Sequence, residues 1–588
     1  MASSLCPLTG LFLLLLSIVN TSWSRVDDLV VQTKNGNVQG ALNPVLGGHV
    51  RVFLGIPYAK PPLGPLRFRP PQPAEKWNKN LEAFSYPNSC YQLPDNTFPG
   101  FLGSEIWNPN TPVSEDCLYL NVWSPHVNRS EPQPLVPVMV WIYGGGFSSG
   151  TSSLPLYNGL FLSKSENVVV VSMNYRLGAL GFLSLPNHNT IKGNVGLLDQ
   201  QLALRWVADN IAAFGGDPSK VTIFGESAGS AAVGFHLLSP GSQELFQRAV
   251  MQSGCPIAPW AHLSQETAWK RAESLVEILG CPLSPAAKME ACLQEVSAKD
   301  IVTKQFAVPY ASSLNIMFAP VVDGIFLPLS IQDMLSSNEL TKKDVLFGLN
   351  QNEGTYFLPY GVPGFNLSTN SISRAQFLQG IPIVMPDAGN ATRVAAIFQY
   401  TDWTDEYNLT KNRDHMGNLY GDSLFVCPVL EFIQKYSQIG GRSFLYWFDH
   451  RSSVNPWPEW MGVMHGYEIE FVFGMPLNET VGYTKKEVNM TKKFMKHWTN
   501  FARTGNPSID GAGWPSFTAD KMEYVTLNYN QPETRRQLRA HECHFWNTVV
   551  PEIQTIYDTL MECSLGNVLR SSLWPLLLLL VMSVIFQL

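Results

Sequence analysis

The chain has 588 residues, of which 45% are hydrophobic and 15% charged, and its formal net charge at pH 7 is -7. This length could hold several domains, but strand-like and helix-like segments alternate without a linker or a repeat, which predicts one large α/β domain. No basic cluster interleaved with aromatic residues indicates nucleic acid, and the acidic balance favours cationic partners.

The N-terminus carries a leucine-rich apolar run, Leu5–Val19, that is too short to span a bilayer. Ser22-Trp-Ser24 follows, with small residues where signal peptidase requires them. We predict that residues 1–24 are a signal peptide and that the mature chain begins at Arg25. The charged residues after this point disfavour the alternative, a buried N-terminal helix.

A glycine triplet follows the apolar segment Val136–Val140, which we predict to be a strand, in Trp141-Ile-Tyr-Gly-Gly-Gly-Phe147. Glycines let backbone amides approach a substrate closely, so the amides of Gly145 and Gly146, together with that of Ala228, are candidate donors to a developing oxyanion. The alternative for a lone triplet is a tight turn that simply requires glycine.

The sequence Gly225-Glu-Ser-Ala-Gly229 matches the Gly-x-Ser-x-Gly pattern of a nucleophilic serine. Val221–Phe224 reads as a short buried strand, and the small and apolar residues from Ala228 onward suit a packed helix. A strand, a sharp turn and a helix in this order would expose the hydroxyl of Ser227. The pentapeptide also occurs by chance, so its context must decide.

A serine nucleophile in such a fold is followed along the chain by an acid and then by a histidine. Glu353 ends the apolar strand predicted over Val345–Leu349, although a surface turn would also suit this residue. His465 lies between the glycines of Gly462-Val-Met-His-Gly466, from which a loop can present its ring. Ser227, Glu353 and His465 are the candidate triad.

The C-terminus ends in an apolar run, Leu573–Leu588, with no lysine or arginine after it. Small residues and a polar bridge precede this run, which is the layout of a signal for a glycosylphosphatidylinositol (GPI) anchor, a lipid that replaces the tail. We predict Ser564 as the anchored residue and residues 565–588 as the propeptide. A short transmembrane helix kept in the mature protein is the alternative.

Nine cysteines are present, and Cys6 would leave with the signal peptide. The other eight would face an oxidising compartment, although the sequence does not choose among their pairings. Six N-glycosylation sequons agree with a secreted surface, at Asn128, Asn366, Asn390, Asn408, Asn478 and Asn489. We predict no cofactor and no metal site.

From about Leu29 to Cys563 the chain resembles the cholinesterases of the carboxylesterase family. The likeness is carried by Phe53-Leu-Gly-Ile-Pro-Tyr, Ser114-Glu-Asp-Cys-Leu-Tyr-Leu-Asn-Val, Gly193-Asn-Val-Gly-Leu-Leu-Asp-Gln, Phe224-Gly-Glu-Ser-Ala-Gly and Trp457-Pro-Glu-Trp-Met-Gly-Val-Met-His-Gly-Tyr-Glu-Ile-Glu-Phe. The resemblance implies an α/β-hydrolase fold over residues 25–545, with a large, mostly parallel central sheet flanked by helices. It also implies Ser227, Glu353 and His465 as the triad of an acyl-enzyme mechanism, with Glu226 and Glu468 lining the site.

Cleavage of choline esters is the activity that the resemblance implies. Choline carries a quaternary ammonium that aromatic faces can hold. Trp107 and Tyr356 match the family's choline site, with Asp95 as a guiding carboxylate. Phe357, Tyr157 and Trp457 would line nearby walls.

Leu314 and Ile316 fall on two acyl-pocket positions where acetylcholinesterases have phenylalanine, and Trp260 matches another wall of that pocket. Aliphatic side chains would leave room for acyl groups larger than acetyl, such as butyryl. At the mouth of the site, three positions that are aromatic in acetylcholinesterases fall on Leu93, Ser148 and Gln305. Phe306 would take the place of Gln305 if the alignment slips by one residue.

The family's pairing would join Cys90 with Cys117, Cys281 with Cys292 and Cys427 with Cys543, leaving Cys255 free. Cys563 would link two subunits through a helix over residues 546–564, giving a disulfide-linked homodimer. Its GPI anchor would hold it on the extracellular face of the membrane, with the synapse as a candidate location. A broad carboxylesterase and a catalytically inactive adhesion protein are the rival functions.

Overall fold

The computed structural model describes residues 29–125, 134–185, 188, 190–309, 314, 316–337, 340–509 and 513–565. The predicted signal peptide, the start at Arg25, the sequon at Asn128 and the tail beyond Leu565 lie outside these residues.

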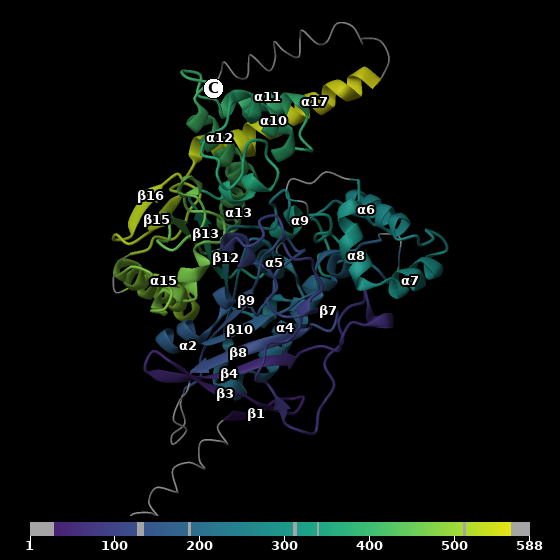
Figure 1. Cartoon of the computed structure of the whole chain (residues 1–588), viewed down its shortest axis with the longest axis vertical. Coiled ribbons are helices and arrows are strands. Elements are labelled where there is room, and N and C mark those ends of the chain that lie inside the picture. Colours follow the sequence, from purple (N-terminus) through teal and green to yellow (C-terminus); the bar gives the residue numbers. More distant parts are fainter. Residues whose placement is uncertain are drawn as a thin grey trace, which may run out of the picture.

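An eleven-stranded sheet forms the centre of the molecule (Figure 1), with the order β16-β15-β14-β13-β12-β11-β9-β10-β8-β4-β3. The neighbours from β10 to β15 are parallel, whereas β3, β4, β8 and β16 are joined to it by antiparallel pairs. The strands are β3 (Ala41–Val45), β4 (Gly48–Pro57), β8 (Tyr119–Pro125), β9 (Val136–Ile142), β10 (Val169–Met173), β11 (Gly216–Glu226), β12 (Arg248–Gln252), β13 (Asp344–Asn350), β14 (Ser443–Phe448), β15 (Glu523–Leu527) and β16 (Glu533–Arg536). The expected large and mostly parallel sheet is confirmed.

Helices flank the sheet, and α5 packs on β9, β11 and β12. The helices are α1 (Leu102–Glu105), α2 (Leu160–Glu166), α3 (Gly178–Phe182), α4 (Val195–Asn210), α5 (Ala228–Leu238), α6 (Gln265–Ile278), α7 (Ala286–Glu295), α8 (Ala298–Lys304), α9 (Ile331–Leu335), α10 (Arg374–Val384), α11 (Asn390–Gln399), α12 (Leu409–Gly421), α13 (Cys427–Gln438), α14 (Ile469–Val472), α15 (Lys485–Thr504), α16 (Ala540–His544) and α17 (Val550–Leu565). Two small sheets complete the fold, one of β1 (Val30–Gln32), β2 (Asn37–Gln39) and β5 (Leu81–Glu82), the other of β6 (Ser89–Cys90) and β7 (Val113–Ser114).

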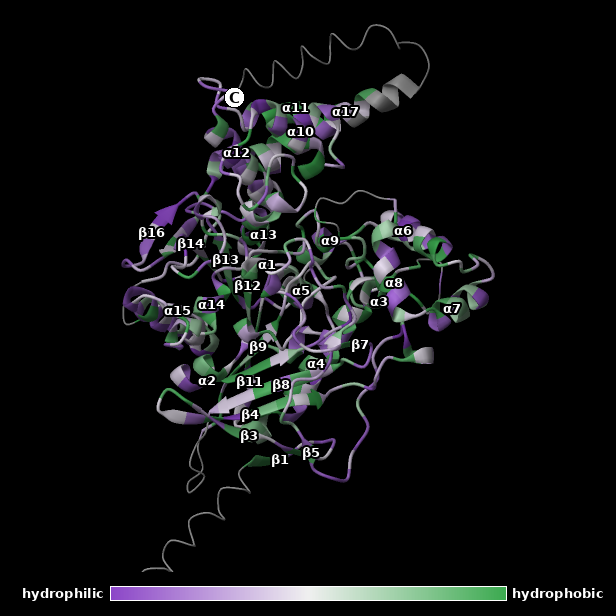
Figure 2. Ribbon diagram, in the orientation of Figure 1, coloured by the Kyte–Doolittle hydropathy of each residue, from purple (hydrophilic) through white to green (hydrophobic). Residues whose placement is uncertain are grey.

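The strands of the central sheet are apolar because helices bury them. All five residues of β10, Val-Val-Val-Ser-Met, are buried, as expected for a parallel strand covered on both faces. Figure 2 shows hydrophobic residues along the central strands and hydrophilic ones toward the outer helices. The strands predicted over Val136–Val140, Val221–Phe224 and Val345–Leu349 lie inside β9, β11 and β13.

The last helices form a separate layer, with α10, α11, α12 and α17 together at one end of the molecule (Figure 1). Helix α17 covers most of the segment predicted to be helical at the C-terminus and packs on α11. Among the described residues, no helix is both long and apolar enough to cross a membrane.

Candidate active site

Ser227 lies at a sharp turn between strand β11 and helix α5. Its φ angle of 57° is unusual for a residue other than glycine, so the surrounding fold must hold it. A Cβ on Gly225 would lie 2.6 Å from the carbonyl oxygen of Gly229, and a Cβ on Gly229 would lie 2.0 Å from that of Ile142. Both glycines of the pentapeptide are therefore required by close packing between the turn, the helix and strand β9.

His465 is held by Glu353 through a hydrogen bond of 2.6 Å between Nδ1 and Oε2. Their two loops are joined by a backbone bridge between Asn352 and Met464. The other oxygen of Glu353 accepts from the Ser253 hydroxyl at 2.6 Å and from the Asn350 amide at 2.7 Å. These bonds fix the carboxylate, which in turn fixes the orientation of the imidazole.

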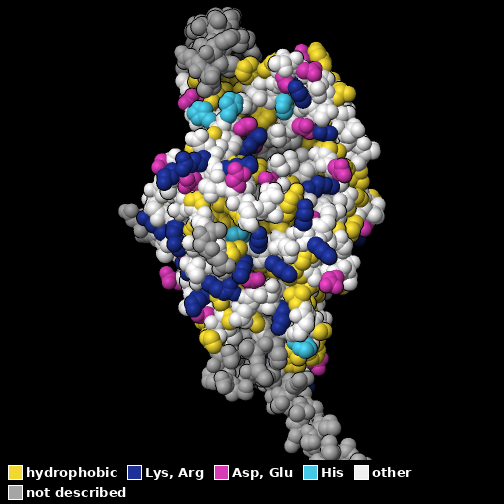
Figure 3. Space-filling model, turned by 90° about the vertical axis from the view of Figure 1, so that its left-hand side faces the viewer, with side chains coloured by type: hydrophobic (Ala, Val, Ile, Leu, Met, Phe, Trp, Pro, Cys, Tyr) yellow, Lys and Arg dark blue, Asp and Glu magenta, His cyan; other side chains and the backbone are white. Residues whose placement is uncertain are grey.

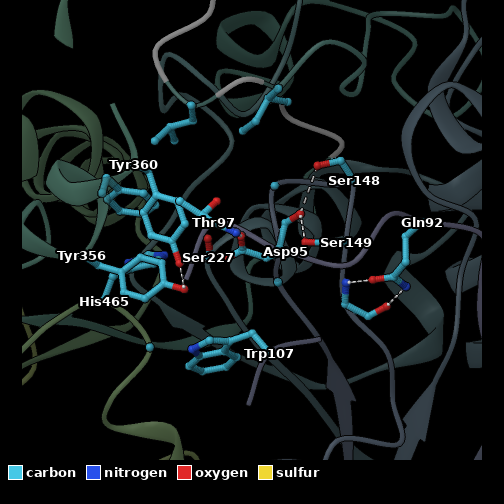
Figure 4. Close-up of a pocket in the computed structure, with 18 of the residues that line it drawn as sticks. Gln92, Asp95, Thr97, Trp107, Ser148, Ser149, Ser227, Tyr356, Tyr360 and His465 are labelled. Carbon is cyan, nitrogen blue, oxygen red and sulfur yellow. Dashed lines mark hydrogen bonds between the residues drawn. The ribbon is translucent and has the colours of Figure 1, made fainter. Parts of the chain in front are cut away.

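Nε2 of His465 lies 3.1 Å from Oε1 of Glu226 and makes no hydrogen bond within the described part of the chain. Ser227 and His465 border the same cavity (Figure 4). Catalytic hydrogen bonds are often long in a free enzyme and tighten when substrate is bound. The arrangement therefore suits transfer of a proton from Ser227 to His465.

Buried carboxylates set the electrostatics around the histidine. Burial raises the pKa of Glu226, opposed by His465 and reinforced by Glu468 and Glu353. Burial lowers the pKa of His465, but Glu226, Glu353 and Glu468 together outweigh it and raise that pKa. Glu468 accepts hydrogen bonds from Gln252 at 2.8 Å and from Asn350 at 2.6 Å. Negative charge around the ring thus stabilises the imidazolium.

The glycine triplet forms a loop beside the serine, since a Cβ on Gly144 would lie 2.9 Å from the Cβ of Ser227. Gly145 and Gly146 have φ angles of 101° and 59°, and a Cβ on Gly145 would lie 2.4 Å from the carbonyl oxygen of Ser149. Within the described residues, the amides of Gly145, Gly146 and Ala228 donate no hydrogen bond. They are therefore free to bind an oxyanion.

A cavity of about 740 Å³ joins these groups. Its wall includes the catalytic candidates, the glycine loop and a set of aromatic, aliphatic and acidic side chains, among them Asp95, Trp107, Tyr157, Glu226, Trp260, Leu314, Ile316, Tyr356, Phe357 and Tyr360. Figure 4 shows Trp107, Tyr356 and Tyr360 around the space near Ser227 and His465.

The aromatic wall of the cavity is built from two segments. Trp107 lies in the loop closed by Cys90 and Cys117, with its ring centroid 6.1 Å from that of Tyr467. Tyr356 packs its ring 5.4 Å from that of Trp457, which contacts the wall from behind. These faces are a suitable surface for a cation.

Tyr360 connects the aromatic wall of the cavity to Asp95. The sequence reasoning missed this residue. Its hydroxyl donates to Asp95 at 2.9 Å and lies 3.4 Å from that of Tyr356. Both tyrosines belong to one 3-10 helix, Thr355–Tyr360. Their spacing of four residues in the sequence could have indicated that Tyr360 lies on the same short helix as Tyr356 and faces the same cavity.

On the other side of the serine, Leu314, Ile316 and Trp260 line the cavity. Ile316 lies against the glycine loop, because a Cβ on Gly146 would be 3.2 Å from its Cγ1. Trp260 is fixed by a hydrogen bond of 2.8 Å from its indole to the carbonyl of Leu424. An aliphatic side chain thus stands next to the glycine loop in the wall of the cavity.

The mouth of the cavity requires one correction. Gln305 is buried, and its side chain accepts a hydrogen bond from the Ala179 amide at 2.9 Å, away from the cavity. Phe306, which is 43% exposed, lines the cavity instead, together with Leu93 and Ser148. Helix α8 ends in a 3-10 turn that points residue 306 outward, so the mouth retains one aromatic ring.

The structure contains all three disulfides that the resemblance implies, Cys90–Cys117, Cys281–Cys292 and Cys427–Cys543, and Cys255 is free and buried. The side chains of Cys563 and Ser564 lie outside the described residues, although their backbone belongs to α17. The five described sequon asparagines are exposed or half-buried.

The profile of the carboxylesterase family matches residues 27–546. The chain belongs to this family. This carboxylesterase is 47% identical to an acetylcholinesterase of Bungarus fasciatus over 556 residues, which cover 94% of the chain and 91% of that relative. It is 48% identical to a cholinesterase of Mus musculus, covering 92% and 90%, and 45% identical to an acetylcholinesterase of Electrophorus electricus, covering 94% and 92%. The protein is a carboxylic ester hydrolase.

Proposed function

We propose that this carboxylesterase hydrolyses choline esters, including esters with acyl groups larger than acetyl, through a covalent acyl-enzyme. The observation that carries this proposal is that Trp107 and Tyr356 border the same cavity as Ser227 and His465. A cation held on the aromatic faces would place its ester within reach of the serine. The names of the relatives support the same substrate class.

In the proposed mechanism His465 removes the proton of Ser227 as the hydroxyl oxygen attacks the ester carbonyl. Glu353 holds the ring and stabilises its charged form, and the amides of Gly145, Gly146 and Ala228 bind the oxyanion. His465 then returns the proton to the departing choline. Water, activated by the same histidine, releases the acid and restores the serine.

The acyl side supports a wide substrate range. Leu314 and Ile316 are smaller than phenylalanine and leave space beside the glycine loop, and one methylene in such a pocket is worth about 1–3 kcal/mol. We expect comparable rates on acetylthiocholine and butyrylthiocholine.

The test is a double variant, Leu314→Phe with Ile316→Phe, which we expect to lower kcat/KM for butyrylthiocholine by at least tenfold while acetylthiocholine is still turned over.

A matched pair of variants, Trp107→Ala and Trp269→Ala, separates choline recognition from general esterase activity, because Trp269 is partly exposed on α6 and outside the cavity. Trp107→Ala should raise KM for thiocholine esters and leave an uncharged butyl ester unaffected. Equal loss on both esters would favour a broad carboxylesterase, and no turnover of any ester would favour an inactive adhesion protein.

We propose that the protein acts outside the cell as a homodimer, linked through Cys563 and anchored by GPI at Ser564. Exposed apolar residues on the same layer as α17, including Val394 and Phe398 of α11, support such an interface. Non-reducing electrophoresis of Cys563→Ser should show only monomer, with Cys255→Ser unchanged as the control. Release from cells by a phosphatidylinositol-specific phospholipase tests the anchor.

A further inference from the structure

Helix α15 presents a row of basic side chains to solvent. Its lysines Lys485, Lys486, Lys492, Lys493 and Lys496 are all exposed, whereas Glu487, the acidic residue of this helix, is 1% exposed. Within the described part of the chain, none of the five lysines forms a close ion pair with a carboxylate, although the charge of Lys496 acts on Glu166 and favours its ionised form. A chain with a net charge of -7 therefore carries a concentrated positive region.

The turn of the neighbouring hairpin of β15 and β16 lies against one of these lysines. Nζ of Lys486 lies 5.1 Å above the ring of Tyr529, which belongs to the turn of this hairpin. Arg535 and Arg536 are exposed on β16 opposite the start of β15, and each is paired with a glutamate. Figure 3 shows lysine and arginine side chains gathered on this face. We call the row of exposed lysines on this helix the α15 basic face, which comprises Lys485, Lys486, Lys492, Lys493 and Lys496.

The arrangement of these lysines does not favour the stability of the helix. Lys485 and Lys486 occupy the first turn, where the helix dipole disfavours cations. Lys492 and Lys496 are four residues apart on one surface, a spacing at which like charges repel. An anionic ligand would relieve both effects, so the row is better explained by binding than by folding.

We propose that the α15 basic face binds a linear sulfated polysaccharide. From Lys485 to Lys496 the row extends along the helix axis for about 16 Å, which is long enough to meet several sulfates of one chain. The lysines lie in a row along an exposed helix and do not enclose a pocket. The face therefore suits an extended polyanion better than a single small anion. Helix α17, which leads to the C-terminal tail, lies at another part of the molecule (Figure 1), so the basic face is not at the end where a membrane anchor would be.

Heparin is the probe for the test. The variant Lys492→Glu, Lys493→Glu, Lys496→Glu should elute from immobilised heparin at a lower NaCl concentration than the wild-type protein and bind heparin at least tenfold more weakly in 0.1 M NaCl. The dependence of log Kd on log salt should become shallower by about 2, because fewer counterions are released. The matching variant with arginine at the same three positions should retain binding.

The control is Lys76→Glu, Lys79→Glu, Lys288→Glu, which changes the net charge equally at exposed lysines elsewhere and should bind as wild type. Asn489→Gln should bind at least as tightly as wild type, because a glycan on this exposed sequon would stand on the same face. Thermal unfolding and hydrolysis of an uncharged ester should be unchanged in every variant. The proposal is overturned if the wild-type protein does not bind immobilised heparin in 0.1 M NaCl. It is also overturned if the control variant loses as much heparin affinity as the α15 variant.

Two further arms identify the ligand. Free sulfate at the concentration of sulfate groups in heparin should compete no better than NaCl of the same ionic strength, and equal competition with heparin would overturn the need for a polymer. Vesicles of phosphatidylserine and phosphatidylcholine should bind weakly. Binding to these vesicles without binding to heparin would assign the face to a membrane surface and overturn the polysaccharide.

Discussion

Single side chains set the protonation of the proposed base. The carboxylate of Glu226 raises the pKa of His465, so Glu226→Gln should lower that pKa and move the acidic limb of the kcat/KM profile to lower pH. The measurement is a pH profile of thiocholine ester hydrolysis. Glu470→Gln, a buried carboxylate outside the cavity, is the control and should leave the limb in place. A limb that moves to higher pH contradicts the assignment.

We expect Glu353 to act through its charge as well as through its hydrogen bond to His465. Glu353→Gln keeps a side chain of the same shape but removes the charge that stabilises the imidazolium, and kcat should fall by about 10⁴-fold. Steady-state kinetics with titrated active sites measure this change. A loss below tenfold would mean that another carboxylate orients the ring.

Tyr360 positions Asp95 at the cavity and does not touch the reacting atoms. Tyr360→Phe removes the hydrogen bond to Asp95 and should raise KM for cationic esters several-fold with little change in kcat. Phe98→Leu, which alters a ring that packs against Tyr360 but leaves its hydroxyl, is the comparison. A fall in kcat of Tyr360→Phe without a change in KM would contradict the proposal that Tyr360 only positions Asp95.

At the scale of elements, the serine turn depends on close contact between α5 and β9. Gly229→Ala would place a methyl group 2.0 Å from the Ile142 carbonyl, so the helix must shift. We expect a loss of about 1–3 kcal/mol in the free energy of unfolding, together with most of the activity. Gly513→Ala, where the new Cβ meets nothing within 4 Å, should behave as wild type in the same thermal unfolding assay.

Disulfides join elements that are distant in sequence. Removing Cys427–Cys543, which are 116 residues apart, should destabilise the protein more than removing Cys281–Cys292, which are 11 apart. Chain entropy gives about 4.7 kcal/mol for a loop near 100 residues and about 3 kcal/mol for one near 15. Unfolding midpoints of the paired Cys→Ala variants test this order, and the reverse order would contradict it.

The local sequence pattern predicted helices, strands and turns well where their structure depends on one segment of the chain alone. The apolar strands and the glycines around Ser227 follow from short-range rules, as does the turn that bears His465. Tyr360 was not assigned, and Phe306 was named only as the alternative to Gln305, because their places depend on how a 3-10 turn directs side chains relative to a distant loop. Glu353 was ambiguous for the same reason, since its role requires the neighbouring loop that carries His465.

For the whole molecule, net charge and the acidic mouth should act together on the rate of encounter with substrate. A chain of charge -7 with Asp95 at its cavity attracts cationic esters over long range. Raising NaCl from 0.01 to 0.5 M shortens the screening length from about 30 Å to a few Å and should lower kcat/KM for a thiocholine ester. An uncharged ester of the same size should show no such decrease, and an equal decrease would contradict steering.

The loop closed by Cys90 and Cys117 contains both Asp95 and Trp107, whereas Ser227, Glu353 and His465 lie outside it. The two halves of the site are therefore held in place by different kinds of constraint. Hydrogen bonds and close packing hold His465, Glu353 and the turn of Ser227, while a covalent bond limits how far the segment with Asp95 and Trp107 can move. Selective opening of this one disulfide should therefore loosen the wall that carries Trp107 and leave the hydrogen bond between Glu353 and His465 in place.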